Sequence, residues 1–90
     1  EGSHRSGLFW LAAALFGQRR YSESIVAAQQ LVGRHPDFGN GYLELARSLE
    51  TSGRRKEALQ VYRDLRVSRS DADSKEEGNR RMSLLQETME

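Results

Sequence analysis

The chain has 90 residues, which suits one small domain and leaves little room for a large enclosed active site. Its 14 basic and 13 acidic residues leave a formal net charge of +1, unlike the strongly basic balance of a dedicated nucleic-acid-binding domain. The absence of cysteine excludes disulfides and thiolate metal sites. The longest apolar run, Leu8 to Phe16, is shorter than the roughly 20 residues that cross a bilayer, so we expect no membrane span.

Residues 1–4 resemble the remainder of a cleaved expression tag and are set apart from the fold. His4 therefore carries no weight as a metal ligand, and we expect neither a metal nor a cofactor. No targeting segment is visible, so the cytoplasm is the favoured compartment, although a native signal upstream of such a tag would not be seen.

A period of 34 residues runs through the chain. It pairs Leu8 with Tyr42, Leu11 with Leu45, Ala12 with Ala46 and Leu15 with Leu49. The spacing i, i+3, i+4, i+7 places each set of four on one face of a helix. The second half of each unit repeats this spacing with Ser24, Ile25, Ala28 and Leu31, and then with Ala58, Leu59, Tyr62 and Leu65. Each unit is therefore predicted to be a helical hairpin.

Turn signals separate the predicted helices. Gly17–Tyr21 and Thr51–Arg55 lie within the units, and His35-Pro36-Asp37 lies between them. Ser22 is the expected N-cap of the second helix, and Asp37 is placed to accept from the free amides of the third. These breaks predict one unit at 5–38 and another at 39–72.

The two units resemble the tetratricopeptide repeat, whose pattern reads W-x2-L-G-x2-Y, then A-x3-F, then P. The second unit matches it with Tyr42, Leu45, Ala46, Leu49, Ala58 and Tyr62. Pro36 stands at the terminal proline place, whereas Ser24, Ala28 and Ser70 depart from the pattern. The resemblance covers residues 5–72 and implies an all-α fold of tandem helix-turn-helix repeats, stacked as an α-solenoid into a right-handed superhelix.

Residues 73–90 are predicted to form a C-terminal capping helix rather than a third repeat. The period places Glu76, Asn79, Arg80 and Ser83 where a third unit needs apolar side chains. Ser74 and Glu77 instead form a capping-box signature, and Met82, Leu85 and Met89 give a sparse apolar stripe. Residues 66–73 are the expected connecting loop, and Gly78 weakens the prediction for the early part of the helix.

The first predicted helix is apolar on all sides, which is typical of a helix buried on more than one side. Arrays of this kind usually need three or more repeats, and this chain offers two. We hypothesise that Trp10 and its neighbours contact a second copy of the chain, as in a homodimer, or upstream repeats of a longer parent protein. The alternative is that the second helix and the capping helix cover this face.

In the tetratricopeptide family the first helices of successive units line the inner wall of the superhelix. A stripe beside the core stripe holds the predicted partner-binding residues Phe9, Ala13, Phe16, Leu43, Arg47 and Glu50. A groove of this composition suits an amphipathic helix or an extended peptide with hydrophobic anchors. The carboxylate clamp of one family branch is not expected, because its places hold Ser6, Phe9, Ala13, Asn40, Leu43 and Arg47. The alternatives are that Phe9 and Phe16 are ordinary core and that Arg47 is solvated.

No motif for catalysis is present, since His35 lies in a turn and no phosphate-binding loop or nucleophile motif occurs. We expect a non-catalytic scaffold or adaptor that binds a protein or peptide. The rival interpretation is an RNA-binding helical repeat of the pentatricopeptide kind, with a basic side made of Arg54, Arg55, Lys56, Arg63, Arg66 and Arg69. Acidic residues at Asp64, Asp71 and Asp73 interrupt that side, so nucleic acid is the less favoured partner.

Overall fold

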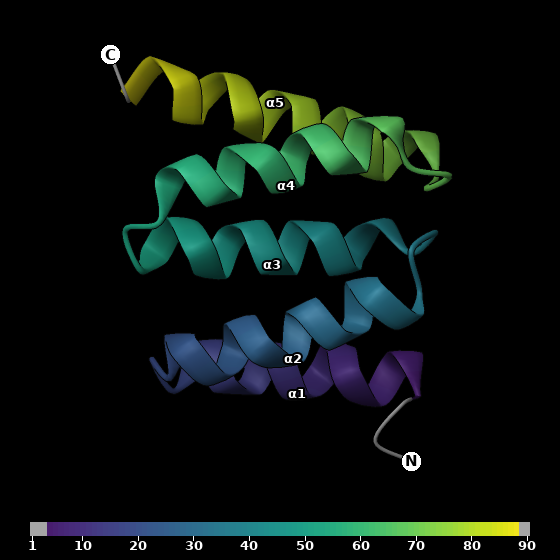
Figure 1. Ribbon diagram of the computed structural model, residues 1–90, viewed down its shortest axis with the longest axis vertical. Helices are drawn as coiled ribbons and strands as arrows, with labels where there is room; N and C mark the ends of the chain where they lie inside the picture. The colour runs from purple at the N-terminus through teal and green to yellow at the C-terminus, as the bar shows by residue number, and fades with distance from the viewer. Residues whose placement is uncertain (1–3, 89–90) are drawn as a thin grey trace.

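The computed structural model describes residues 4–88 and, within that range, is entirely helical. The helices are α1 (Arg5–Gly17), α2 (Tyr21–Arg34), α3 (Gly39–Thr51), α4 (Arg55–Val67) and α5 (Ala72–Thr88). They stack one after another along the long axis of the molecule (Figure 1). The predicted all-α tandem array is thus confirmed. Residues 1–3 of the predicted tag and Met89 lie outside the described residues.

The two hairpin turns are built in the same way. Arg19 and Gly53 both adopt positive φ, at 63° and 87°, and they stand 34 residues apart. Each is followed by an arginine, Arg20 or Arg54, whose backbone N–H returns to a carbonyl of the preceding helix at 2.9 or 2.8 Å. Glycine adopts positive φ without strain, whereas Arg19 pays a conformational cost for it. The expected N-cap at Ser22 is wrong, because α2 begins at Tyr21 with Arg20 as its cap residue.

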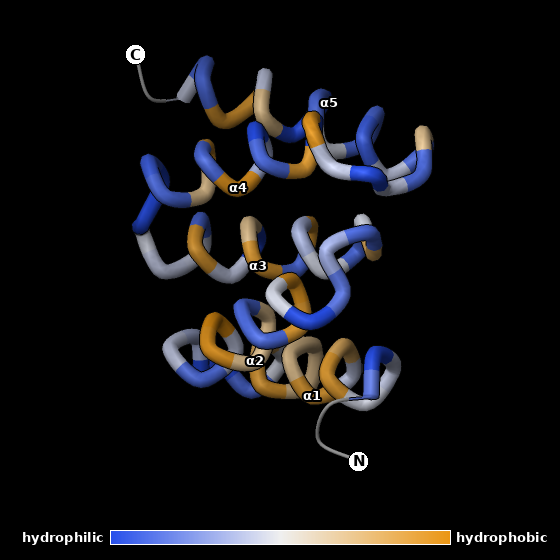
Figure 2. The backbone as a smooth tube through the Cα atoms, turned by 45° about the vertical axis from the view of Figure 1, so that its right-hand side comes forward, coloured by the Kyte–Doolittle hydropathy of each residue, from blue (hydrophilic) through white to orange (hydrophobic). Residues whose placement is uncertain are grey.

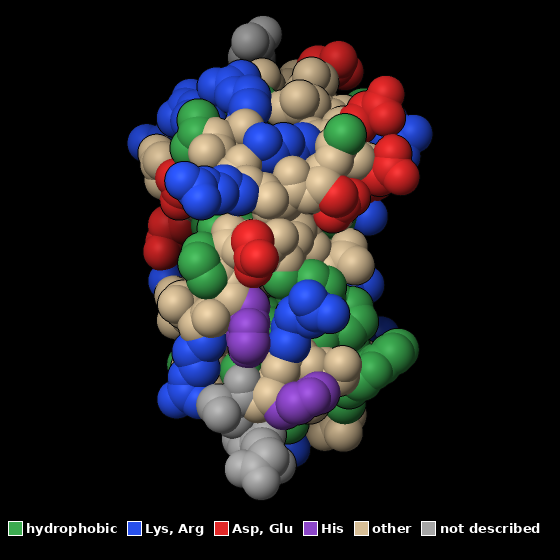
Figure 3. Space-filling model, turned by 90° about the vertical axis from the view of Figure 1, so that its right-hand side faces the viewer, with side chains coloured by type: hydrophobic (Ala, Val, Ile, Leu, Met, Phe, Trp, Pro, Cys, Tyr) green, Lys and Arg blue, Asp and Glu red, His purple; other side chains and the backbone are tan. Residues whose placement is uncertain are grey.

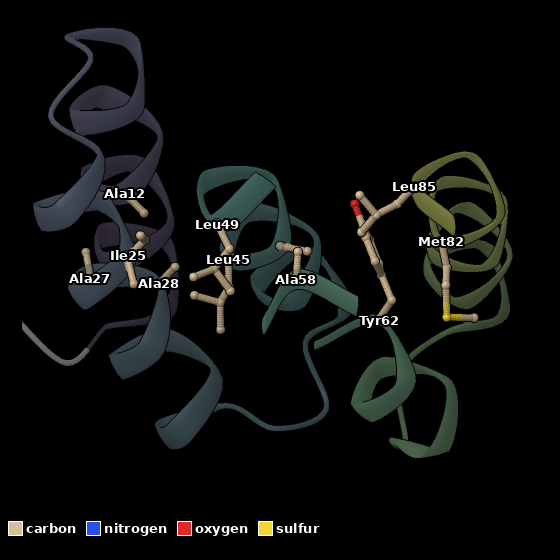
Figure 4. Close-up of a cluster of buried hydrophobic side chains, with 11 residues drawn as sticks. Ala12, Ile25, Ala27, Ala28, Leu45, Leu49, Ala58, Tyr62, Met82 and Leu85 are labelled. Atoms are coloured by element: carbon tan, nitrogen blue, oxygen red, sulfur yellow. The ribbon is translucent and has the colours of Figure 1, made fainter. Parts of the chain in front are cut away.

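The core follows the predicted stripes. Four alanines, Ala12, Ala28, Ala46 and Ala58, have no exposed area and lie where helices meet closely. Figure 4 shows the buried cluster running from the first hairpin through Leu45, Leu49, Ala58 and Tyr62 to Met82 and Leu85. One continuous core therefore joins all five helices of the described chain.

Leu11 departs from the prediction. It was expected on the core face, yet it is 49% exposed, whereas its counterpart Leu45 is 6% exposed. The reason is position in the stack, because α2 packs against α3 while α1 has no preceding helix among the described residues. Figure 2 shows hydrophobic residues along α1 at this end of the molecule, in contrast to the largely hydrophilic α5.

A buried hydrogen bond joins the first three helices. The Ser24 hydroxyl on α2 donates to the Ala12 carbonyl of α1 at 2.9 Å and lies 2.9 Å from the Ser48 hydroxyl of α3. Neither serine has exposed area. Since the one proton of Ser24 goes to Ala12, Ser48 is the donor between the two serines.

α5 packs as a helix of the array, and its register corrects the sequence prediction. Its buried residues Gly78, Met82 and Leu85 follow Tyr42, Ala46 and Leu49 by 36 residues rather than 34. The polar residues that the shorter period placed on the core face, Glu76, Asn79, Arg80 and Ser83, are all exposed. A shift of two residues therefore hid the match between α5 and the first helices of the units.

Gly78 supports α5 instead of disrupting it. A Cβ at this position would lie 2.5 Å from Cδ2 of Leu65, so glycine permits the close approach of α4 and α5. The first turn of α5 is capped by Asp71, whose carboxylate accepts from the Ser74 amide and hydroxyl, each at 2.9 Å. The predicted Ser74–Glu77 capping box is therefore wrong, and these bonds lower the pKa of Asp71.

We predict that Gly39→Ala destabilises the protein by about 1–3 kcal/mol, because a Cβ on Gly39 would lie 2.3 Å from Cβ of Ser74. Gly33→Ala is the matched control, since a Cβ there meets nothing within 4 Å and alanine favours helix by up to about 1 kcal/mol. Chemical denaturation of both variants tests this. Equal stability of the two would contradict the close approach of α3 and α5.

Ser24→Ala and Ser48→Ala are each expected to destabilise the fold by about 1–3 kcal/mol, because each leaves a buried hydroxyl short of a partner. The double variant should cost less than the sum of the two, since both buried hydroxyls are then gone. A double-mutant cycle measured by urea denaturation checks this, and simple additivity would refute the coupling.

Candidate interaction groove

The first helices of the units, α1, α3 and α5, lie next to one another in the stack, with contacts between α1 and α3 and between α3 and α5. Between α3 and α5 the surface opens into a groove of about 290 Å³. Its lining comes from three helices and consists of Arg47, Glu50, Thr51, Tyr62, Arg81 and Leu84. Two of the predicted partner-binding residues, Arg47 and Glu50, thus border an actual groove.

All six predicted partner-binding residues, Phe9, Ala13, Phe16, Leu43, Arg47 and Glu50, are half-buried. They are neither fully enclosed in the core nor freely solvated. The alternative that Phe9 and Phe16 are ordinary core is therefore only partly met. A row of half-buried side chains along neighbouring helices can still be covered further by a partner.

Arg47 connects α1 and α3 across the face of the groove. Its guanidinium carbon lies 3.9 Å from the centroid of the Phe16 ring, within the range of a cation–π interaction. The same guanidinium donates to both carboxylate oxygens of Glu44, at 2.8 and 2.6 Å. Glu44 is 6% exposed, and a buried carboxylate needs such a partner. Arg47 is therefore fixed in place, which corrects the alternative that it is simply solvated.

Glu50 and Tyr62 form the floor of the groove. The Tyr62 hydroxyl donates to Glu50, and the Tyr62 ring is 1% exposed. Burial of the phenol, followed by the hydrogen bond to Glu50, raises the pKa of Tyr62 well above its ordinary value. The nearby Arg81 acts in the opposite direction. Tyr62 therefore stays a neutral donor that orients the Glu50 carboxylate.

The remaining predicted residues lie away from this groove. The Phe9 ring packs edge-on against Trp10 and Phe38, with ring centroids 5.2 and 5.9 Å apart. Leu43 packs against the core cluster near Gly78 on α5. The structure thus brings Phe16, Arg47 and Glu50 together and places Phe9 in a separate aromatic cluster at the α2–α3 loop.

Sequence reasoning missed Thr51, Tyr62, Arg81 and Leu84. Arg81 and Leu84 follow Leu45 and Ser48 by 36 residues, and those two residues of α3 face the preceding hairpin. A charged side chain at the place of Leu45 stays half-buried, and this polar substitution accompanies the open groove between α3 and α5. The 36-residue offset is the signal that would have found them.

Within the described residues no group of three His, Asp or Glu side chains is arranged to hold a metal ion. The search for membrane-crossing segments likewise finds no helix with the required length and apolar character in the part of the chain that the structure describes.

Comparison with known protein families matches residues 5–87 to the bacterial transcriptional activator domain. The chain belongs to this family. The match extends from the first residue of α1 almost to the end of α5, so both hairpins and α5 fall within one bacterial transcriptional activator domain. Neither the curated proteins nor the solved structures contain a significant match.

The raised pKa of Tyr62 predicts a loss of stability in alkali. Because the folded domain holds this proton more tightly than the unfolded chain, the stabilisation is present below pH 10.0, the ordinary pKa, and is lost above it. Burial also raises the pKa of Tyr42, so Tyr62→Phe should reduce the alkaline loss and Tyr62→Phe with Tyr42→Phe should reduce it further. Urea denaturation between about pH 8 and 11 measures this. Identical alkaline profiles for wild type and the double variant would refute it.

Proposed function

We propose that this bacterial transcriptional activator domain is a non-catalytic protein-interaction module of the tetratricopeptide kind. Its ligand is a peptide or helix from another protein, held along the side formed by α1, α3 and α5. The observation that carries the proposal is the contact of Phe16 with Arg47 beside the open groove of Glu50, Tyr62 and Arg81.

The chemistry of this side changes along its length. At the α1 end it offers half-buried aromatic rings, Phe9 and Phe16, whereas at the α5 end it offers Arg81 beside the exposed apolar Leu84. Aromatic and arginine side chains supply most of the affinity in protein interfaces. An amphipathic segment with apolar anchors at one end and polar groups at the other would complement this arrangement.

The fixed position of Arg47 favours binding over simple solvation. Its side chain is held by Glu44 and Phe16, so little rotamer freedom is left to lose when a partner arrives. By its family the domain belongs to transcriptional activators, and we propose that its partner is a protein that acts in transcription. The proposed role is to hold that protein and requires no catalysis by this chain.

RNA binding by the basic side is the second candidate. Arg54 is paired with Glu57 at 2.7 Å, and Gln60 donates to Asp64 at 3.0 Å, so acidic groups lie among the basic ones on α4. Figure 3, which views the side of the α2–α3 and α4–α5 loops, shows basic and acidic side chains interspersed there. This mixture gives a weak field for phosphate, so the protein-binding role is favoured.

The groove is tested by selecting peptides from a random library on the wild-type domain and measuring their affinity by calorimetry. Phe16→Glu and Leu84→Glu, at opposite ends of the groove, should each weaken binding about tenfold or more. Val67→Glu is the matched control, because Val67 is 81% exposed on α4 and lies outside the groove lining.

Circular dichroism should show all three variants folded. Binding that survives both groove variants would contradict the proposed site. Tight binding of generic RNA that weakens steeply with salt would favour the second candidate instead.

A further inference from the structure

The outer side of the first hairpin exposes large apolar side chains that belong to neither the core nor the interaction groove. Trp10 is 67% exposed, Leu11 49% and Val26 53%. No charged residue occurs from Ser6 to Gly17. An exposed patch of this kind marks an interaction surface more often than an ordinary surface.

The structure itself shows how an equivalent face is covered. Trp10, Leu11 and Ala14 of α1 correspond, 34 residues on, to Glu44, Leu45 and Ser48 of α3. The three residues of α3 are 6%, 6% and 0% exposed, because the preceding hairpin packs on them. The same face of α1 therefore has the geometry that accepts a pair of helices, and its side chains are more apolar than those of α3.

This face carries both a projection and a groove. The groove, of about 410 Å³, lies between α1 and α2 and is lined by Leu11, Leu15, Ser22, Glu23, Val26, Ala27 and Gln30. Its volume falls in the range of sites that enclose a large side chain or a small ligand. Trp10 stands on the same outer side, and its ring is held by an edge-on contact with Phe9 at 5.2 Å between centroids.

We propose that this face binds the same face of a second copy of the chain, with Trp10 of each copy inserted into the α1–α2 groove of the other. A two-fold interface needs one patch that supplies both the projecting and the receiving groups, and this patch has both. The α1 part of the face is uncharged, so two copies meet there without repulsion of like charges.

The polar members of the groove complete the match. A buried indole N–H needs an acceptor, and Ser22, Glu23 and Gln30 all offer oxygens at the groove. An apolar centre with a polar margin is the usual composition of a protein interface. A helix with a strongly acidic or basic face would find no counter-charge on the α1 part, which favours the second copy as the occupant.

The interface is small, so the dimer should be weak and in exchange with the monomer. Interfaces below the standard size give transient complexes, and we expect half-dissociation at a concentration on the order of tens of micromolar. Sedimentation equilibrium of the 90-residue chain from about 1 μM to 1 mM should therefore show a shift from monomer to dimer.

Trp10 is the only tryptophan, so its fluorescence reports directly on this interface. Its emission should shift to shorter wavelength over the same concentration range as the indole leaves water. Trp10→Ala and Val26→Glu should each weaken the dimer about tenfold or more, while Val67→Glu, an equally exposed apolar position on α4, should leave it unchanged.

Circular dichroism of the variants shows whether the fold is kept. A chain that stays monomeric to about 1 mM overturns the proposal, since even a weak interface would be populated there. A dimer that forms with undiminished affinity in Trp10→Ala or Val26→Glu also overturns it, because the copies would then meet through another face.

Discussion

The stack depends on the close approach of successive helices at four alanines, Ala12, Ala28, Ala46 and Ala58, none of which has exposed area. A methyl side chain lets two backbones come together, and the larger residues around it then fill the space on either side. A bulkier residue at any of these places would separate the helices and displace every later element of the array. The distance between α1, α3 and α5, and hence the width of the groove, follows from these contacts.

A polar contact at the centre of this core adds direction to the apolar packing. Apolar contacts tolerate small shifts, whereas the Ser24 hydroxyl reaches the Ala12 carbonyl and Ser48 at one relative position of three helices. The tetratricopeptide pattern favours alanine at the place of Ser24, so this chain departs from it where two hairpins meet. The serine bond fixes the register that alanine packing alone would leave looser.

The sequence predicted α1 to α4 well because the two hairpins follow the same local rules. The i, i+3, i+4, i+7 stripes locate the helices, and Gly53 and Pro36 mark where the chain turns. The prediction failed at α5 because one fixed period was assumed, whereas the loop and first turn held by Asp71 shift the register by two residues. Gly78 looked unfavourable since helix propensity is local, and the reason for glycine is Leu65 on another helix.

The interaction groove was only partly predictable for a related reason. Stripe analysis found Phe16, Arg47 and Glu50, because all three belong to first helices whose phase was known. It could not find Tyr62 or Arg81, since their place depends on how α4 and α5 cross α3. Nor could it show that Arg47 is held by the buried Glu44, because a surface arginine and a pinned one have the same spacing in the sequence.

The two faces at the ends of the described stack differ in a way that the repeat itself does not require. On α5 the exposed places hold Glu76, Asn79, Arg80 and Ser83, which water solvates well, so this face gains little from a partner. On α1 the exposed places hold Trp10 and Leu11, whose burial would stabilise by about 1.5–3 kcal/mol for a side chain the size of leucine. The same helical unit therefore has one face that favours solvent and one that favours association. This asymmetry, rather than the repeat, directs the domain to associate through α1.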